Sequence, residues 1–263
     1  MDLGIRGRVA LIGASARGLG LATACRLALE GANIAICDKD EEALGPATGR
    51  VREARPGVAV KAYRVDLTKA SEIVDLVRDV RRDMGPVDIL VTNSGGPPPG
   101  SFDEADDEKW EFGFRLTFLS AVRLIRAVLP DMKARRWGRI INFTSRALKE
   151  PIPNLVISNA LRLAVGGMAK TLAAEVAEFG ITVNNILPGP TSTDRALELA
   201  AARARKKGIS VDEELSATIR EIPMRRLAKP EEQAAAVAFL ASELAGYITG
   251  TSLLVDGGAV KAL

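Results

Sequence analysis

One stretch near the N-terminus constrains the fold most, Val9-Ala-Leu-Ile-Gly-Ala-Ser-Ala-Arg-Gly-Leu-Gly20. Its first four residues are a continuous apolar run, which is typical of a strand buried on both faces. Small residues follow, and an amphipathic segment from Leu19 to Glu30 predicts a helix. A strand that turns through glycines into a helix presents free backbone N–H groups and the positive end of the helix dipole, which suit a pyrophosphate. Such turns also occur where nothing binds, so the stretch alone does not establish a ligand.

Composition narrows the function classes. The net charge of +3 is small and the charges of both signs are interspersed, which disfavours nucleic acid or a membrane surface as the partner. The chain has no histidine, which excludes His-based triads and disfavours most zinc sites. Cys25 and Cys37 have neither metal-ligand nor disulfide spacing, so we expect two core residues and no metal.

No linker divides residues 1–263, so we expect a single domain. No stretch reaches membrane-spanning length and the N-terminus lacks a long apolar run, so we expect a cytoplasmic protein. Apolar strands alternate with helices throughout, two of the helices being long, over 110–135 and 154–179. This alternation predicts an α/β fold: a doubly wound parallel sheet with helices on both faces.

Polar or conformationally special residues stand at the predicted strand ends, where ligands collect in such sheets. They are Gly13, Asp38, Asp66, Asn93, Ser145 and Pro188.

At this point the chain resembles the short-chain dehydrogenase/reductase family over nearly its whole length. The matching motifs stand in the family's order: the glycine loop, Asp66-Leu67, Asn93-Ser94-Gly95, Ser145, Val183-Asn184, Pro188-Gly189 with Thr193, and Tyr247-Ile-Thr-Gly250 followed by Val255-Asp-Gly-Gly258. The resemblance implies a Rossmann sheet of about seven strands. It also implies a nicotinamide dinucleotide cofactor, a small carbonyl or alcohol substrate, and a homo-oligomer, either a dimer or a tetramer.

The resemblance also implies a set of cofactor-binding residues. They are Gly13, Ala14, Ser15, Arg17, Gly18, Leu19, Gly20, Asp38, Lys39, Asp66, Leu67, Asn93, Ser94, Gly95, Arg162, Pro188, Gly189, Thr191 and Thr193. The family's loop normally begins Thr-Gly, whereas this chain has Gly13-Ala14 there. An alanine tolerates the turn only with a negative φ, which we therefore expect at Ala14.

Charges near the ribose decide between NAD and NADP. Asp38 ends the second predicted strand, where a carboxylate accepts hydrogen bonds from ribose hydroxyls and repels a 2′-phosphate. Arg17 and Lys39 stand where the family's NADP users have basic residues. We favour NAD and leave NADP open.

The family's catalytic pattern is broken. Ser145 is in place, but Ser158 stands where the family has its tyrosine and Arg162 where it has its lysine. Arg115 stands at the position of the family's helical asparagine. An aliphatic hydroxyl is a weaker acid than a phenol and is shorter, and an arginine keeps its charge at any workable pH.

Two functions remain open. In the first, an NAD(P)-dependent oxidoreductase, Ser145 orients the substrate oxygen, Ser158 and Arg162 form an altered polar site, and water or Lys149 supplies the proton. In the second, Ser158 and Arg162 only fill space, and the chain is a catalytically silent dinucleotide-binding protein that acts as a sensor or partner subunit.

The charges of this region suggest a substrate class. Arg115, Arg162, Arg146 and Lys149 would bring cations to one cleft, which favours an anionic, 3-oxoacyl-like substrate carrying a carboxylate or phosphate. The alternative for Arg115 is an ion pair with a nearby acid. Residues 190–225 are expected to form a substrate lid or, alternatively, a plain pair of solvated helices.

Overall fold

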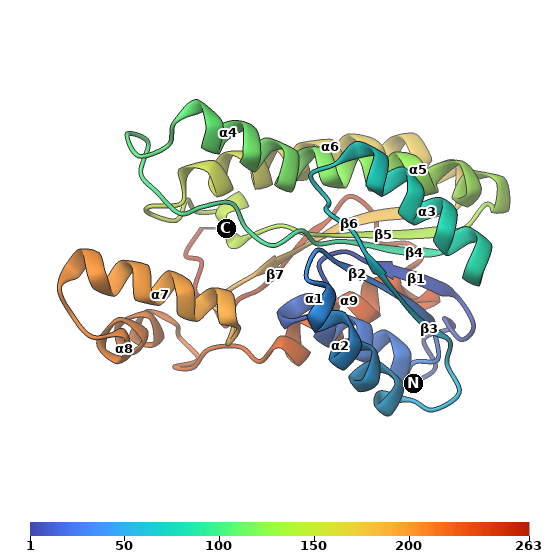
Figure 1. The fold of residues 1–263 in the computed structure, drawn as a ribbon, viewed down its shortest axis with the longest axis horizontal. Helices are drawn as coiled ribbons and strands as arrows, with labels where there is room; N and C mark the ends of the chain where they lie inside the picture. The colour runs from blue at the N-terminus through green and yellow to red at the C-terminus, as the bar shows by residue number, and fades with distance from the viewer. Residues whose placement is uncertain (263) are drawn as a thin grey trace.

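The computed structural model describes residues 1–262. Within them a single sheet has seven parallel strands in the order β3-β2-β1-β4-β5-β6-β7. The strands are β1 (Val9–Ile12), β2 (Asn33–Asp38), β3 (Val60–Arg64), β4 (Ile89–Thr92), β5 (Gly138–Phe143), β6 (Ile181–Pro188) and β7 (Ser252–Val255). The chain runs outward from β1 to β3 and then returns to β4 on the other side of β1, so the strand order reverses between β1 and β4 (Figure 1). This confirms the doubly wound Rossmann sheet.

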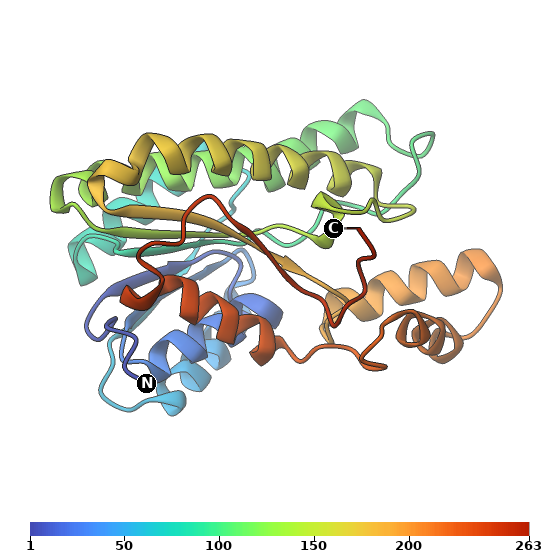
Figure 2. The same cartoon turned by 180° about the vertical axis from the view of Figure 1, so that it is seen from behind.

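Helices cover both faces of the sheet (Figures 1 and 2). One face carries α1 (Gly18–Leu29), α2 (Glu41–Ala54) and α9 (Pro230–Ala241). The other face carries α3 (Ala70–Met84), α4 (Asp107–Gly113), α5 (Ser120–Arg135) and α6 (Val156–Val176).

The helix expected over 110–135 is interrupted. A π-helical turn (Phe114–Leu119) separates α4 from α5, so the two helices run on without a loop but with a local change of register.

The hydrophobic core lies on both sides of the sheet. Every residue of β1, β4 and β5 is buried, as expected of strands covered on both faces. Cys37 of β2 is fully buried, and burial raises the pKa of its thiol to about 12. Cys25 of α1 is partly buried and packs against the other of the two hydrophobic clusters. Both cysteines are therefore packing residues, as predicted.

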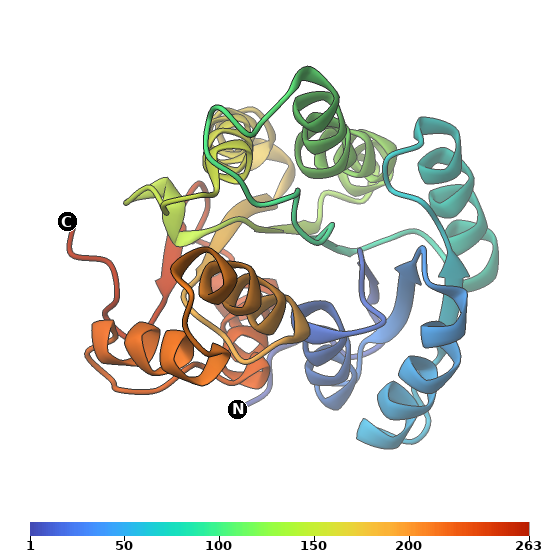
Figure 3. The ribbon, with the colours of Figure 1, turned by 60° about the vertical axis from the view of Figure 1, so that its left-hand side comes forward.

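Two further helices, α7 (Asp194–Lys207) and α8 (Val211–Glu221), follow β6 and stand beyond the carboxyl ends of the strands (Figures 1 and 3). Thr193 caps α7 and Gly208 ends it with a positive φ of 65°. Ser210 and Glu213 form a reciprocal capping box that begins α8. Local signals thus define a helical hairpin within 190–225. In the part of the chain that the structure describes, no helix combines the length and apolarity needed to cross a membrane.

Candidate active site

The glycine loop leaves several backbone donors free. Helix α1 begins after Arg17, whose side chain does not cap it, and its first turn has no acidic residue. The N–H groups of Gly18, Leu19 and Gly20 have no partner within residues 1–262. A Cβ added at Gly18 (φ 55°) would meet only Thr193, at 3.7 Å. Free N–H groups at a helix N-terminus with this much open space fit a phosphate group.

Ala14 departs from the expectation. Its φ is +42°, not negative, so an alanine holds the left-handed conformation that the family gives to glycine. Two contacts fix the loop: Asn93 donates its side-chain N–H to the Ala14 carbonyl at 3.0 Å, and Ser15 N donates to Cys37 O at 3.0 Å. The conformation costs about 1–2 kcal/mol in a non-glycine residue, which these contacts offset.

Three predicted cofactor residues shape the loop from behind. An added Cβ at Gly13 would lie 2.3 Å from the Asn93 carbonyl oxygen, and one at Gly20 would lie 2.5 Å from Ala14 O. Ser15 is fully buried, donates its hydroxyl to Ile12 O at 2.8 Å and accepts from Cys37 N at 3.1 Å. None of Gly13, Ser15 and Gly20 is among the described residues that line the cavity, so their role is to permit close packing.

Charges at the end of β2 are arranged in pairs. The Asp38 carboxylate accepts from the backbone N–H groups of Ala16 and Asp40, each at 3.2 Å. Arg17 forms an ion pair with Asp40 at 2.7 Å, so its charge is balanced within the loop. Lys39 lines the cavity beside them.

A cavity of about 880 Å³ lies over the strand ends, and it brings together most of the predicted cofactor residues. They are Ala14, Arg17, Gly18, Leu19, Asp38, Lys39, Asp66, Leu67, Asn93, Ser94, Gly95, Arg162, Pro188, Gly189, Thr191 and Thr193. The cavity continues from this group past Ser145 and Ser158 to α7 and α8. Its volume, the free N–H groups and the Asp38 carboxylate fit a dinucleotide with a substrate beside it.

Arg162 is tied to the ends of two neighbouring strands. It donates from Nη1 to Phe143 O (2.8 Å) and Thr144 O (3.1 Å), and from Nη2 to Gly95 O (2.7 Å). Burial, and secondarily Arg195, lowers the pKa of Arg162 to about 10. Carbonyl oxygens rather than a carboxylate hold this guanidinium, so no counter-ion neutralises it. Because its pKa is about 10, it stays positive at neutral pH, and it lines the cavity.

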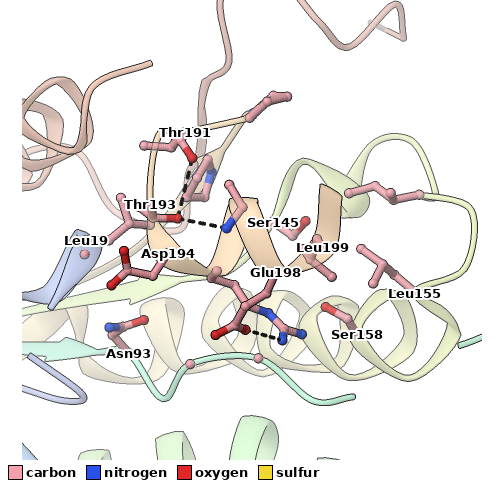
Figure 4. A pocket seen from close by; sticks show the side chains of 18 of the residues that line it. Leu19, Asn93, Ser145, Leu155, Ser158, Thr191, Thr193, Asp194, Glu198 and Leu199 are labelled. Atoms are coloured by element: carbon pink, nitrogen blue, oxygen red, sulfur yellow. Dashed lines mark hydrogen bonds and ion pairs between the residues drawn. The ribbon is translucent and has the colours of Figure 1, made fainter. Parts of the chain in front are cut away.

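Two serine hydroxyls approach the same space. Ser145 follows β5, and its Oγ accepts from Ala147 N at 3.1 Å, which leaves the O–H free to donate. Ser158 lies in the first turn of α6, and its Oγ accepts from Arg162 Nε at 3.3 Å. Figure 4 shows both side chains at the cavity, with Leu155 and Leu199 beside Ser158. Two hydroxyl donors, one backed by a guanidinium, are suited to holding a carbonyl oxygen.

Arg115 lies elsewhere. It sits in the π-helical turn and pairs with Glu111, Nη2 to Oε2 at 3.0 Å, so the alternative of an ion pair with a nearby acid is the one the structure has. Neither Arg115 nor the exposed Lys149 is among the described residues that line the cavity, whereas Arg146 is. The expected gathering of four cations is therefore wrong for Arg115 and Lys149.

Helix α7 adds side chains that the motifs did not single out. Arg195 donates to Pro97 O at 2.7 Å and pairs with Glu198 at 3.3 Å. Leu199 points from α7 toward Ser158 and Leu155, whereas the Glu198 carboxylate lies beside the guanidinium with which it pairs (Figure 4). The sequence does carry a signal for this face of α7: Arg195, Leu199 and Arg203 are spaced four residues apart, and such residues share one helix face.

Comparison with known proteins agrees with a site for a dinucleotide and a substrate. The family model described as enoyl-(acyl carrier protein) reductase matches residues 13–260. The D-beta-hydroxybutyrate dehydrogenase of Cupriavidus necator is 33% identical over 256 residues, covering 97% of this chain and 98% of that protein.

Two solved structures match the fold of this chain over all or nearly all of its length. The L-sorbose reductase of Gluconobacter frateurii, complexed with NADPH and L-sorbose, is 38% identical with a TM-score of 0.94, and the match covers 100% of both chains. An NAD⁺-bound xylitol dehydrogenase is 30% identical with a TM-score of 0.91, covering 97% of this chain and 99% of that one.

Proposed function

The chain belongs to the short-chain dehydrogenase/reductase family of NAD(P)-dependent oxidoreductases, and we propose that it moves a hydride between NAD and a carbonyl or alcohol through an altered active site. The observation that carries the proposal is the Arg162 guanidinium, which is fixed by three backbone carbonyls and donates to Ser158 at the cavity. A residue that only filled space would not need a charge held at this point.

NAD is favoured over NADP by the charges at β2. Asp38 is positioned to accept from ribose hydroxyls, and its negative charge would repel a 2′-phosphate. The Arg17–Asp40 pair leaves Arg17 less available to bind such a phosphate. The nicotinamide ring, when bound, supplies or accepts the hydride, and the residues around it orient the ring and the substrate.

Ser145 and Ser158 donate hydrogen bonds to the substrate oxygen. Because Arg162 donates to Ser158 Oγ, it polarises that hydroxyl and makes it a better donor to an oxygen that gains negative charge. Arg162 thus stabilises the developing alkoxide and transfers no proton itself.

The proton needs another source. Lys149 is exposed and is not among the described cavity residues, so we assign the proton to cavity water, with Glu198 as the carboxylate that accepts it when an alcohol is oxidised. Arg195 keeps that carboxylate over the cavity. In the reducing direction the water protonates the product oxygen and takes a proton back from the protonated Glu198 carboxyl, which is reprotonated from solvent.

Residues 190–225 act as the substrate lid in this proposal. Helix α7 is tied to the loop after β4 at two points, by Arg195 to Pro97 and by Lys206 to Glu104 at 2.6 Å. We also propose an anionic substrate, because Arg146 and Arg162 both line the cavity.

We further propose a homo-oligomer that pairs through the α9 and β7 side of the molecule. Phe239, Tyr247 and Leu253 are exposed there, and large apolar side chains gathered on one side are typical of subunit contacts.

The test is titration of the purified protein with NAD⁺, NADH, NADP⁺ and NADPH, followed by turnover assays on carbonyl compounds. We expect micromolar NAD(H) binding, and turnover that Ser145→Ala with Ser158→Ala abolishes while cofactor binding stays. Cofactor binding without turnover would favour the silent dinucleotide-binding protein, and no binding would reject both.

A further inference from the structure

A second, smaller chamber of about 110 Å³ opens beside the main cavity under α7. Five residues line both spaces, among them Leu155, Leu199 and Arg203, so the two are continuous. Its apolar wall comes from Leu155, Leu199 and Pro99, and its polar wall from Arg203, Lys206 and Lys207.

The chamber has an uncompensated positive charge. Lys206 pairs with Glu104 at 2.6 Å and Lys207 with the buried Glu214 at 2.7 Å. Arg203 has neither an ion pair nor a hydrogen bond with any residue that the structure describes, although it is partly buried. No acidic residue is found among the described residues lining the chamber, so a guanidinium there is left without a counter-ion.

We propose that this chamber binds the anionic end of the substrate, with Arg203 as the residue that selects it. A guanidinium presents paired N–H donors that match carboxylate and phosphate oxygens, and an unpaired one gains most from such a partner. Lys206 and Lys207 add to the positive potential while remaining held by their own carboxylates.

The distance to the reacting centre sets the substrate's shape. Arg203 follows Leu199 by four residues, which places it roughly 6 Å farther along the helix. Leu199 and Leu155 flank Ser158 (Figure 4). A matching substrate therefore has its carbonyl at Ser145 and Ser158, a short apolar segment against these leucines, and an oxyanion at Arg203. This placement of the carbonyl rests on the proposed function, whereas the anion site itself does not.

The test measures binding without turnover. Pentanoate, butyl phosphate and the neutral pentanamide are titrated calorimetrically into the full chain, with and without NAD⁺. We compare the wild type, Arg203→Gln, and the control Arg205→Gln, which removes the same charge from an exposed position of α7. We expect an anion to bind the wild type and Arg205→Gln at least about tenfold more tightly than pentanamide, and Arg203→Gln to lose that preference.

Tighter binding of pentanoate than of butyl phosphate would identify the oxyanion as a carboxylate, and the reverse order would identify it as a phosphate. Equal binding of pentanoate, butyl phosphate and pentanamide, no binding of any of them, or an anion preference that survives in Arg203→Gln would overturn the inference. Because the anion titration is also run without NAD⁺, a failure of cofactor binding would contradict the proposed function and leave the result for the anion site readable.

Discussion

The two halves of the cavity are formed by different groups, one by backbone and the other by side chains. On the side of β1 to β3, free backbone N–H groups of the glycine loop line the cavity, and glycines with no room for a Cβ hold that loop in place. On the side of β5, β6 and α7, side chains such as Ser145, Ser158 and Arg162 form the site. Both halves nevertheless share one unbroken sheet.

This difference shows at which positions the fold tolerates substitution. At Gly13 an added Cβ would lie 2.3 Å from backbone, so the fold itself selects glycine there. Ser158 lines the cavity, and its hydroxyl accepts from Arg162 rather than from a residue of the core. Chemistry can therefore change on the second side while the cofactor side and the fold stay intact.

The largest effect should follow from disturbing the glycine loop on the β1 to β3 side of the cavity. Gly13→Val forces a side chain into Asn93 O and should destabilise the protein by about 3 kcal/mol and weaken NADH binding more than roughly a hundredfold. Gly49→Ala is the control, since its Cβ position in α2 is open, and should be neutral or slightly stabilising. Thermal melts and cofactor titration measure both. Tight NADH binding by Gly13→Val would show that the close packing does not matter.

On the side of β5, β6 and α7, Arg162→Gln should lower kcat by about a hundredfold and Arg162→Lys by about tenfold. Arg162→Gln should also lower the melting temperature, because three backbone carbonyls lose their donor. Lysine keeps the charge but has no planar fork for three carbonyls on two strands. A kcat of Arg162→Gln close to that of the wild type would remove Arg162 from the mechanism.

The pH profile sharpens this test. The pKa of Arg162 is lowered to about 10, so turnover should fall as pH rises through that value and the charge is lost. Between about 10 and the ordinary 12.5, the unfolded chain binds the extra proton, so this group alone makes stability rise with pH there. A falling limb near pH 10 that persists in Arg162→Gln must come from another group.

A smaller effect is expected at the ribose end. Asp38→Ala should weaken NADH binding about tenfold and strengthen NADPH binding, because it removes both an acceptor and a repulsive charge. Asp40→Ala is the informative companion, since it frees Arg17 and should strengthen NADPH alone. If Asp38→Ala leaves the ratio of the two affinities unchanged, the carboxylate does not choose the cofactor.

The smallest effect should come from Ala14. Ala14→Gly relieves the strain of a positive φ but makes the unfolded chain freer, so we expect a net stabilisation of about 0.5–1 kcal/mol with cofactor affinity retained. Denaturant unfolding measures it. A destabilised Ala14→Gly would mean that the contacts of the loop, not its φ, dominate.

Much of this arrangement could be predicted from the sequence, because strand–helix alternation and small residues at turns are local signals. The sheet and the strand ends follow from them, whereas the gathering of Ser145, Ser158 and Arg162 was implied by the resemblance to the family. The φ of Ala14 could not, since it depends on Asn93, which lies far away in the chain.

The direction of Arg115 also escaped prediction, because the π-helical turn rotates the register within a continuous helix. The position of the α7 side chains at the cavity could not be predicted, because it depends on how the α7–α8 hairpin folds back over the strand ends. Long-range docking, rather than local propensity, decided the placement of α7, whereas Arg115 is held by a local ion pair with Glu111, four residues earlier in the chain.

Hydride transfer by the wild type and by a variant without the two serine hydroxyls shows directly whether the altered site is catalytically active. Wild type and the Ser145→Ala/Ser158→Ala variant, both saturated with NADH, are mixed with a panel of oxo acids, and nicotinamide absorbance is followed. We predict saturable oxidation of NADH by the wild type and none by the variant at equal cofactor occupancy. Equal rates in the two proteins, or no reaction in the wild type with NADH fully bound, would contradict an altered but working active site.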